Sequence, residues 1–316
     1  MRALPSLTEI QAVGRLIAGH VPESPLVEWP SSAGQVRLKL ENLLPTGSFK
    51  IRGATAVLLS LTAEERAAGL VTPSAGNMAR AVARLAHEHG IPCTAVVPDH
   101  VPAAKVEALA TWGAKVVRLP VAEWWTIMES GTTEAFPGTL VHPFADPRVV
   151  AGNGTIGLEL ARDFPDVETV LVPFGGGGLS LGIAASVKAL MPGVSVLAVE
   201  VSTSAPLSAA WSAGHPVDAP YAATWVDGIG SPRIANDMWD LVHIHLDGVV
   251  TVEPEEAAEA VRELALTAKV VAEGAGAAAV AALRTGKAGD GKVACVVSGG
   301  NLDASLLAST LSDGGK

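Results

Sequence analysis

The chain has 316 residues, which is long enough for one large domain or two modest ones with a sizeable core. Hydrophobic residues make up 49% of it but aromatic residues only 4%, as is typical of helices packed on buried strands. The net charge of −10 and the lack of basic runs exclude nucleic acid as a partner, because such a chain repels phosphate backbones.

The N-terminal stretch MRALPSLTEIQAVGRL contains no apolar signal segment and no small-residue cleavage site, so we expect no secretory signal and a cytoplasmic location. Cys93 and Cys295 match no metal-ligand spacing, and we interpret them as two reduced, buried thiols. The longest uncharged run, residues 169–187, contains Pro173 and a row of four glycines. We therefore expect no membrane-spanning helix there.

Strands and helices alternate along the chain. Short runs rich in β-branched residues, each ending in a turn signal, predict strands at residues 36–40, 94–98, 115–119, 169–174, 195–200 and 292–298. One helix is predicted over residues 77–89, with Gly90 as its stop. Another begins at Pro254, with an inward face of Ala257, Val261, Leu264 and Ala268. This order predicts an α/β fold with mostly parallel sheets covered by helices, in which ligands bind beyond the carboxyl ends of strands.

Lys50 is the first candidate reactive residue along the chain. It lies in ENLLPTGSFKIRGATAVLL, and residues 54–59 after it resemble a buried helix. A lysine removed from water has a lowered pKa and can act as a nucleophile or base. A surface lysine is the usual alternative for any single Lys, and this stretch alone does not decide between the two.

Three loops combine glycine with small polar residues. The SAGN loop (Ser74, Ala75, Gly76 and Asn77) precedes the helix predicted over residues 77–89, and the SGGN loop (residues 298–301) follows the strand predicted at residues 292–298. From their residues alone, helix capping is the favoured interpretation of both. The glycine loop (Gly175, Gly176, Gly177 and Gly178) joins a strand to a predicted helix, so its backbone N–H groups are suited to binding phosphate. It lacks the Lys and Ser/Thr of a nucleotide P-loop, and a flexible turn is the alternative.

In order and in wording, these segments resemble the fold-type II pyridoxal-phosphate (PLP) enzymes, in particular the serine/threonine dehydratase and serine racemase group. The matching segments are TGSFKIRGA (46–54), SAGN (74–77), HPFADPRVVAGNGTIGLE (142–159), GGGGL (175–179), VDGIG (226–230), KVVAEGAGAAA (269–279) and SGGN (298–301). The resemblance covers nearly the whole chain. It implies a two-domain, tryptophan synthase β-like α/β fold, with residues 1–68 and 146–316 as the large domain and 69–145 as the small one. PLP would lie in the cleft between them, and the protein would be a homodimer.

The resemblance also implies a role for each motif. Lys50 would carry PLP covalently and then act as the base that removes the Cα proton. The cofactor contacts would come from Phe49, Asn77, Gly175, Gly176, Gly177, Gly178, Leu179 and Ser298. The SAGN loop (Ser74, Ala75, Gly76 and Asn77) would bind the substrate carboxylate. The implied reaction converts a β-hydroxy amino acid of the threonine or serine type to a 2-oxo acid and ammonia by α,β-elimination.

Three alternatives to this lyase reaction follow from the same resemblance. A racemase of the group uses a serine where this chain has Ala75, which cannot carry a proton. The β-replacement enzymes resemble a pattern with Asp after the lysine, where this chain has Ile51. A PLP-binding protein without turnover is the third alternative, against which the intact Lys50, glycine loop and Ser298 argue.

The chain departs from the group pattern in its acidic and aromatic residues. No Asp follows Glu200, although metal-binding members have a second carboxylate there, so we expect no metal. Trp124 and Trp125 lie in an unusual segment, where they could line a substrate entrance, form a subunit contact or pack on the small domain.

Two further departures concern the substrate and regulation. Met78 stands where the dehydratases usually have His. The sequence therefore does not fix threonine or serine as the preferred substrate, and a bulkier or more polar β-hydroxy amino acid is an alternative. Few residues follow Asn301, and we expect no regulatory domain and no inhibition by isoleucine.

Overall fold

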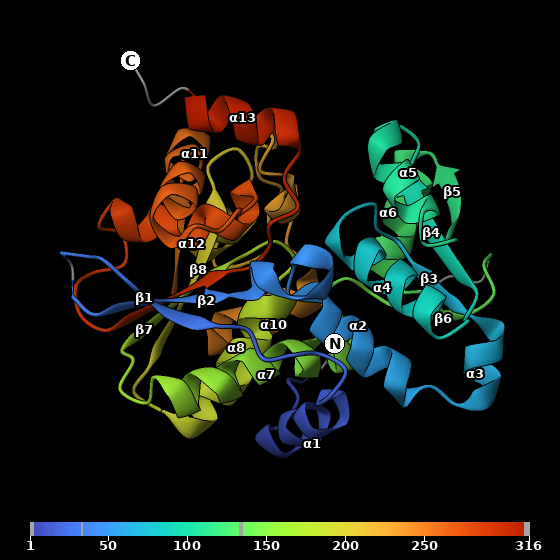
Figure 1. The fold of residues 1–316 in the computed structure, drawn as a ribbon, viewed down its shortest axis with the longest axis horizontal. Coiled ribbons are helices and arrows are strands. Elements are labelled where there is room, and N and C mark those ends of the chain that lie inside the picture. Colours follow the sequence, from blue (N-terminus) through green and yellow to red (C-terminus); the bar gives the residue numbers. More distant parts are fainter. Residues whose placement is uncertain (1–2, 33, 133–134, 313–316) are drawn as a thin grey trace.

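The computed structural model describes residues 3–32, 34–132 and 135–312. Its strands form a six-stranded sheet and a four-stranded sheet, which lie in two lobes side by side (Figure 1). The larger sheet has the order β1-β2-β10-β7-β8-β9. Its strands are β1 (Leu26–Trp29), β2 (Val36–Leu40), β7 (Thr169–Pro173), β8 (Ser195–Val201), β9 (Gly248–Val252) and β10 (Val293–Val297). β1 pairs antiparallel with β2, and the other pairings in this sheet are parallel.

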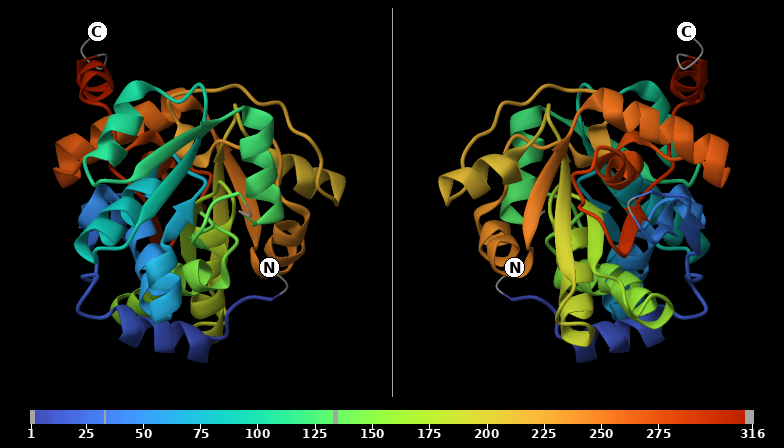
Figure 2. Two further views of the ribbon diagram at one scale, coloured as in Figure 1. Left: turned by 90° about the vertical axis from the view of Figure 1, so that its right-hand side faces the viewer. Right: turned by 90° about the vertical axis from the view of Figure 1, so that its left-hand side faces the viewer.

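Helices cover both faces of the larger sheet (Figure 2). Strand β10 explains why: Val293, Cys295 and Val297 pack in one core cluster, and Ala294 and Val296 in another. A strand buried on both faces requires a continuous apolar run, as its sequence VACVV provides. The first cluster includes α11 (Pro254–Glu263) and α12 (Gly274–Arg284), and the second includes α7 (Pro147–Asp163), α8 (Gly178–Leu190) and α10 (Asn236–His245).

The smaller sheet has the order β5-β4-β3-β6, and all of its pairings are parallel. Its strands are β3 (Leu70–Thr72), β4 (Cys93–Pro98), β5 (Lys115–Leu119) and β6 (Thr139–Leu140). The helices α4 (Asn77–Glu88), α5 (Ala103–Ala110) and α6 (Val121–Ser130) lie around it (Figure 1). The sheet therefore draws its strands from residues 70–140, whereas the domain boundaries at residues 68 and 146 stay a prediction.

The remaining elements connect and flank the two sheets. They are α1 (Leu7–Ile17), α2 (Lys50–Ser60), α3 (Ala63–Ala68), α9 (Pro206–Ala213), α13 (Ala304–Ser312) and the short helices η1 (Glu41–Leu43), η2 (Pro45–Gly47), η3 (Asp227–Ile229) and η4 (Leu264–Ala268). Figure 2 shows α1 (dark blue) and α13 (red) at opposite ends of the molecule. In the part of the chain described, no helix combines the length and apolarity needed to cross a membrane.

The predicted α/β fold with mostly parallel sheets is confirmed, and so are the two buried, unpaired thiols of Cys93 and Cys295. Each of the six predicted strands matches an observed one to within one residue at either end. The helix from Pro254 was predicted too long. Its α-helical part ends at Glu263, and a π-helical turn follows, which closes at Lys269 with a left-handed φ of 60°. Ala268 lies in this π-helical turn and is only partly buried, although it still packs against the core cluster that contains Ala257, Val261 and Leu264.

Candidate active site

A cavity of about 800 Å³ lies at the carboxyl ends of strands from both sheets. Its walls include residues that follow β3, β4, β6, β7 and β10, which is where parallel α/β sheets place their ligands. Every residue predicted for the site lines this cavity: Phe49, Lys50, Ser74, Ala75, Gly76, Asn77, Gly175, Gly176, Gly177, Gly178, Leu179 and Ser298. The fold thus brings together all of the sequence motifs.

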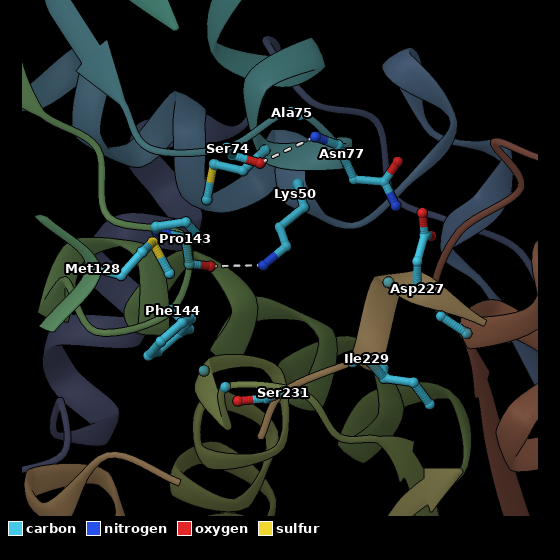
Figure 3. Close-up of a pocket in the computed structure, with 18 of the residues that line it drawn as sticks. Lys50, Ser74, Ala75, Asn77, Met128, Pro143, Phe144, Asp227, Ile229 and Ser231 are labelled. Atoms are coloured by element: carbon cyan, nitrogen blue, oxygen red, sulfur yellow. Dashed lines mark hydrogen bonds between the residues drawn. The ribbon is translucent and has the colours of Figure 1, made fainter. Parts of the chain in front are cut away.

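Lys50 is the first residue of α2, and its amine points into the cavity (Figure 3). Its Nζ donates a hydrogen bond to the carbonyl oxygen of Pro143 at 2.6 Å and lies 4.8 Å from the centre of the Phe49 ring. Burial lowers the pKa of Lys50 to about 8, although the negative charge of Glu273 opposes this shift. About a tenth of the amine is therefore neutral at pH 7, far more than for an ordinary lysine, and the neutral amine is the form that a nucleophile or base requires.

The backbone before Lys50 pairs with the SGGN loop. Phe49 N–H donates to the Ser298 carbonyl at 3.0 Å, Ser48 forms a β-bridge with Gly299, and Gly300 N–H donates to the Gly47 carbonyl at 2.8 Å. These bonds hold the reactive lysine beside Ser298, a residue that follows it by more than two hundred positions. The SGGN loop is thus a partner of the lysine segment and does not cap α13, which begins only at Ala304.

The glycine loop lies against the backbone and ring of Phe144. A Cβ atom on Gly176 would lie 2.2 Å from the Phe144 ring, and one on Gly178 would lie 2.5 Å from the Phe144 carbonyl oxygen. Gly177 has a φ of +89°, which also favours glycine. Because α8 begins at Gly178, the first N–H groups of this helix lack intrahelical partners and face an anion site without side chains.

The SAGN loop leads into α4. The N-cap residue of α4 is Gly76, which has no side-chain cap, and the Ser74 hydroxyl instead accepts a hydrogen bond from Gly76 N–H at 3.2 Å. Side-chain capping of this helix, the interpretation from the residues alone, is therefore wrong. The helix N-terminus and the loop backbone are suited to a carboxylate, and Figure 3 shows Ser74 and Ala75 on the α4 side of the Lys50 amine.

A polar network that the sequence analysis did not assign surrounds Asn77. Its Nδ2 donates to Glu273 at 2.6 Å, and its Oδ1 accepts from Asn301 at 2.7 Å. Arg80 in turn donates to the side-chain oxygen of Asn301 at 2.9 Å. Burial raises the pKa of Glu273 to about 7, and the bond from Asn77 opposes this shift. Both Glu273 and Asn301 lie in segments that carry the family resemblance, so the signal for them was present in the sequence.

His142 is a second unassigned residue, and it connects α6 to the loop beside Lys50. Its Nδ1 accepts hydrogen bonds from the N–H groups of Phe144 (3.3 Å) and Ala145 (2.9 Å). Its Nε2 must therefore carry the proton, which it donates to the Met128 carbonyl at 3.0 Å. Burial lowers the pKa of His142, so the ring stays neutral in this role.

The residues around Glu200 do not fit a metal ion. Its two carboxylate oxygens accept hydrogen bonds from Leu207 N–H (2.7 Å), Ser208 N–H (2.8 Å) and the Ser208 hydroxyl (2.9 Å), at the start of α9. Burial raises the pKa of Glu200 to about 7. Within residues 3–32, 34–132 and 135–312, no group of three His, Cys, Asp or Glu side chains could hold a metal. Glu200 is a structural acid of the strand end.

Comparisons with known proteins all match this chain to pyridoxal-phosphate dependent enzymes and their relatives. The model of the family described as pyridoxal-phosphate dependent enzyme matches residues 17–299. An L-threonine ammonia-lyase of Thermotoga maritima is 42% identical over 87% of this chain and 69% of that protein. Among solved structures, maize serine racemase matches with a TM-score of 0.88 and 28% identity, covering 99% of this chain and 98% of that one. A threonine deaminase from T.th. matches with a TM-score of 0.81 and 34% identity, covering 95% of this chain and 99% of that one.

Proposed function

The chain belongs to the family of pyridoxal-phosphate dependent enzymes, and on that premise we propose that it is an ammonia-lyase for a β-hydroxy amino acid of the threonine or serine type. The observation that carries the proposal is that Lys50, the glycine loop and Ser298 line one cavity. The relatives named above support the reaction type, since one of them is an L-threonine ammonia-lyase and another a threonine deaminase.

The cavity lining fits PLP. The glycine loop and Leu179 would hold its phosphate through backbone N–H groups, because α8 begins at Gly178 and its first N–H groups lack intrahelical partners. The ring would lie against Phe49, with Asn77 at its hydroxyl and Ser298 at its nitrogen, and Lys50 would bind its aldehyde carbon. When bound, PLP supplies the electron withdrawal that makes the substrate Cα proton acidic.

The side chains of the cavity would then carry out an elimination. The N–H groups of the SAGN loop hold the substrate carboxylate, and the neutral Lys50 Nζ takes the Cα proton. The Cα–H and Cβ–O bonds would break, and the departing hydroxide would take up one proton, which balances the proton that Lys50 removes from Cα, to leave as water. A second water then hydrolyses the dehydrated amino acid to a 2-oxo acid and ammonia, so that no water is consumed overall.

A racemase is the principal alternative, because solved serine racemases share the fold. Racemisation needs a second acid on the substrate face opposite Lys50. Ala75 of the SAGN loop offers only a methyl group there, which favours the lyase. The intact SAGN loop beside Lys50 argues against a binding protein without turnover, because such a protein would not need a site for the substrate carboxylate.

The assembly and location of the protein are proposed by resemblance alone. We expect a homodimer in the cytoplasm, with residues 69–145 closing on the remainder of the chain when substrate binds. Sedimentation of the purified protein at several concentrations would test the dimer.

The test of function is to supply the PLP-loaded protein with L-threonine and L-serine and to measure 2-oxo acid and ammonia, which should form in equal amounts. Lys50→Ala should lower turnover by at least about a thousandfold and abolish the absorbance of lysine-bound PLP. Lys292→Ala, which changes an exposed lysine paired with Asp166, is the matched control. Persistence of that absorbance in Lys50→Ala would refute the assignment of the lysine, and formation of the opposite enantiomer as the main product would identify a racemase.

A further inference from the structure

We propose that the substrate carries a large apolar group on its β-carbon, of which an aromatic ring is the best fit, and that this group packs against a wall formed by Trp124 and Met128 of α6. This inference rests on the proposed lyase function and names the substrate class of the same cavity. Three observations support it: the position of α6 in the cavity, the aromatic character of the face that α6 turns toward the cavity, and the charged residues near that face.

The inner face of α6 is aromatic and belongs to the cavity. Trp124, Trp125 and Met128 all line it. Trp124 and Met128 are four residues apart and so share one face of the helix, and the ring of Trp125 lies 5.8 Å from that of Trp124. No residue of α6 is fully buried, and neither tryptophan belongs to the described core clusters. The two rings are therefore available to a ligand.

The wall lies next to the reacting atoms. Lys50 Nζ donates to the carbonyl of Pro143, and the neighbouring His142 donates to the carbonyl of Met128. Figure 3 shows the Met128 side chain beside Pro143, on the side toward which the Lys50 amine points. A substrate whose Cα proton is within reach of Lys50, and whose carboxylate is on the SAGN loop, directs its β-substituent toward this wall.

The cavity has to hold both PLP and the substrate. Its volume of about 800 Å³ includes the PLP site, and the wall of α6 lines the same space. The methyl group of threonine would leave most of the tryptophan surface uncovered, whereas an aromatic ring gains both burial and ring–ring contact.

The charge on the wall itself disfavours a second carboxylate on the β-carbon. Besides Lys50, the cations that line the cavity are Arg80, Lys105 and Arg233. Lys105 pairs with Asp227 and Arg233 pairs with Asp218, whereas Arg80 donates to the neutral amide of Asn301. The charged residue that α6 adds is Glu129, which accepts a hydrogen bond from the Trp125 indole at 2.8 Å and would repel an acidic substrate.

The first experiment compares kcat/KM of the PLP-loaded enzyme for L-threo-3-phenylserine, L-threonine and L-threo-3-hydroxyaspartate. We expect phenylserine to exceed threonine by at least about tenfold, since an apolar pocket discriminates by that order for added apolar surface. Trp124→Ala should reduce the phenylserine-to-threonine ratio by about tenfold or more. Trp112→Ala removes a tryptophan whose ring packs edge-on against His87 and does not line the cavity, and should leave the ratio unchanged.

The second experiment measures binding without elimination, using L-phenylalanine and L-2-aminobutyrate, which lack a β-hydroxyl. L-Phenylalanine should have an inhibition constant at least about tenfold lower than that of L-2-aminobutyrate. Trp124→Ala should make the two inhibition constants equal. Threonine turnover without preference for phenylserine or for L-phenylalanine would overturn the substrate class and leave the lyase intact, and so would a preference for hydroxyaspartate. If L-phenylalanine binds preferentially but no substrate yields a 2-oxo acid, the result would support the aromatic wall as a binding site and overturn the proposed lyase function.

Discussion

At the scale of single residues, the reactivity of the site comes from the removal of Lys50 from water. An ordinary lysine titrates near pH ~10.4, whereas burial lowers the pKa of Lys50 to about 8. Its hydrogen bond to the Pro143 carbonyl orients the amine without adding a negative charge. The nearby carboxylate of Glu273 limits the shift, because it stabilises the ammonium form.

The rate at which the cofactor-free protein captures PLP should therefore rise with pH and level off above a midpoint near pH 8, because only the neutral amine attacks the aldehyde. Glu273→Gln should move this midpoint to lower pH, since it removes the charge that favours the ammonium form. Stopped-flow absorbance of the bound cofactor measures both profiles. Glu259→Gln, a change on the exposed face of α11, should behave as the wild type. A rate that continues to rise up to the pH range of an ordinary lysine would contradict the assigned pKa.

At the scale of elements, the site depends on two close contacts made by helix N-termini. The glycine loop and the start of α8 lie so close to Phe144 that only glycine fits at Gly176 and Gly178. The start of α9 is fixed by the carboxylate of Glu200, which satisfies N–H groups that the helix itself leaves unpaired. Both contacts follow the carboxyl ends of neighbouring strands, β7 and β8.

Gly178→Ala should weaken PLP binding by at least about tenfold and lower the free energy of unfolding by about 1–3 kcal/mol. The added Cβ would lie 2.5 Å from the Phe144 carbonyl oxygen and 2.8 Å from its Cα, so one backbone segment must move. Equilibrium titration with PLP and thermal melting measure the two effects. Gly193→Ala is the control, because a Cβ there meets nothing within 4 Å. Wild-type PLP affinity in Gly178→Ala would argue against a phosphate site at this loop.

Glu200→Gln should lower the free energy of unfolding by about 1–2 kcal/mol, because a single amide oxygen cannot accept the three hydrogen bonds that the carboxylate accepts. Urea denaturation measures this loss, and Glu255→Gln on the exposed first turn of α11 is the control. Addition of a chelator should leave the melting temperature of the wild type unchanged. A melting temperature that falls on chelation would show that a metal contributes to this region.

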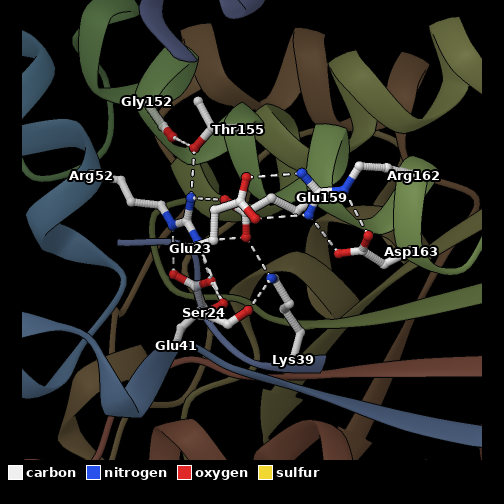
Figure 4. A network of polar contacts seen from close by, with 10 residues as sticks. All are labelled: Glu23, Ser24, Lys39, Glu41, Arg52, Gly152, Thr155, Glu159, Arg162 and Asp163. Atoms are coloured by element: carbon white, nitrogen blue, oxygen red, sulfur yellow. Dashed lines mark hydrogen bonds and ion pairs between the residues drawn. The ribbon is translucent and has the colours of Figure 1, made fainter. Parts of the chain in front are cut away.

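At the scale of the whole molecule, a buried ionic network fixes the segment that carries Lys50 (Figure 4). Arg52 pairs with Glu41 and Glu159, and Lys39 also pairs with Glu159. All four side chains are at most 7% exposed, and their two positive and two negative charges balance. The network joins β2, η1, α2 and α7, so the helix that begins at Lys50 is tied to both the large sheet and its covering helix.

Arg52→Met should lower the free energy of unfolding by about 3–5 kcal/mol, because it leaves Glu41 and Glu159 buried without their main partner. It should also weaken PLP binding, since α2 positions Lys50. Arg162→Ala is the matched control: Arg162 pairs with Glu23 and Asp163 at the surface, where the expected loss is at most about 1 kcal/mol. Chemical denaturation compares the two variants. If both variants lose the same free energy of unfolding, the buried ion pairs of Arg52 contribute no more to stability than the surface ion pairs of Arg162.

Local sequence was sufficient for the regular elements near the site. The VACVV run predicted a strand because buried parallel strands are apolar throughout, and KVVRL predicted one through its β-branched residues although its strand is not buried. The four glycines predicted an anion loop because only glycine allows such a close approach. The strands β1, β3 and β6 were missed, because two to four residues carry too little periodicity to identify them. Strand β9 was also missed, although it is as long as several strands that were predicted. The end of α11 was missed because a π-helical turn replaces the regular helical period there.

The sequence by itself indicated which residues are candidates for the site. Lys50, the glycine loop and Ser298 are each ambiguous alone, and it was their order along the chain, together with the other motifs, that indicated a PLP site. Tertiary structure alone decided their environment. Asn77 meets Glu273 across 196 residues and Arg52 meets Glu159 across 107, so no local pattern could pair them. The pKa of Lys50 and the aromatic wall of α6 likewise depend on burial and on neighbours brought from distant segments. Desolvation and charge pairing are properties of the folded volume, whereas strand and loop preferences arise from adjacent residues.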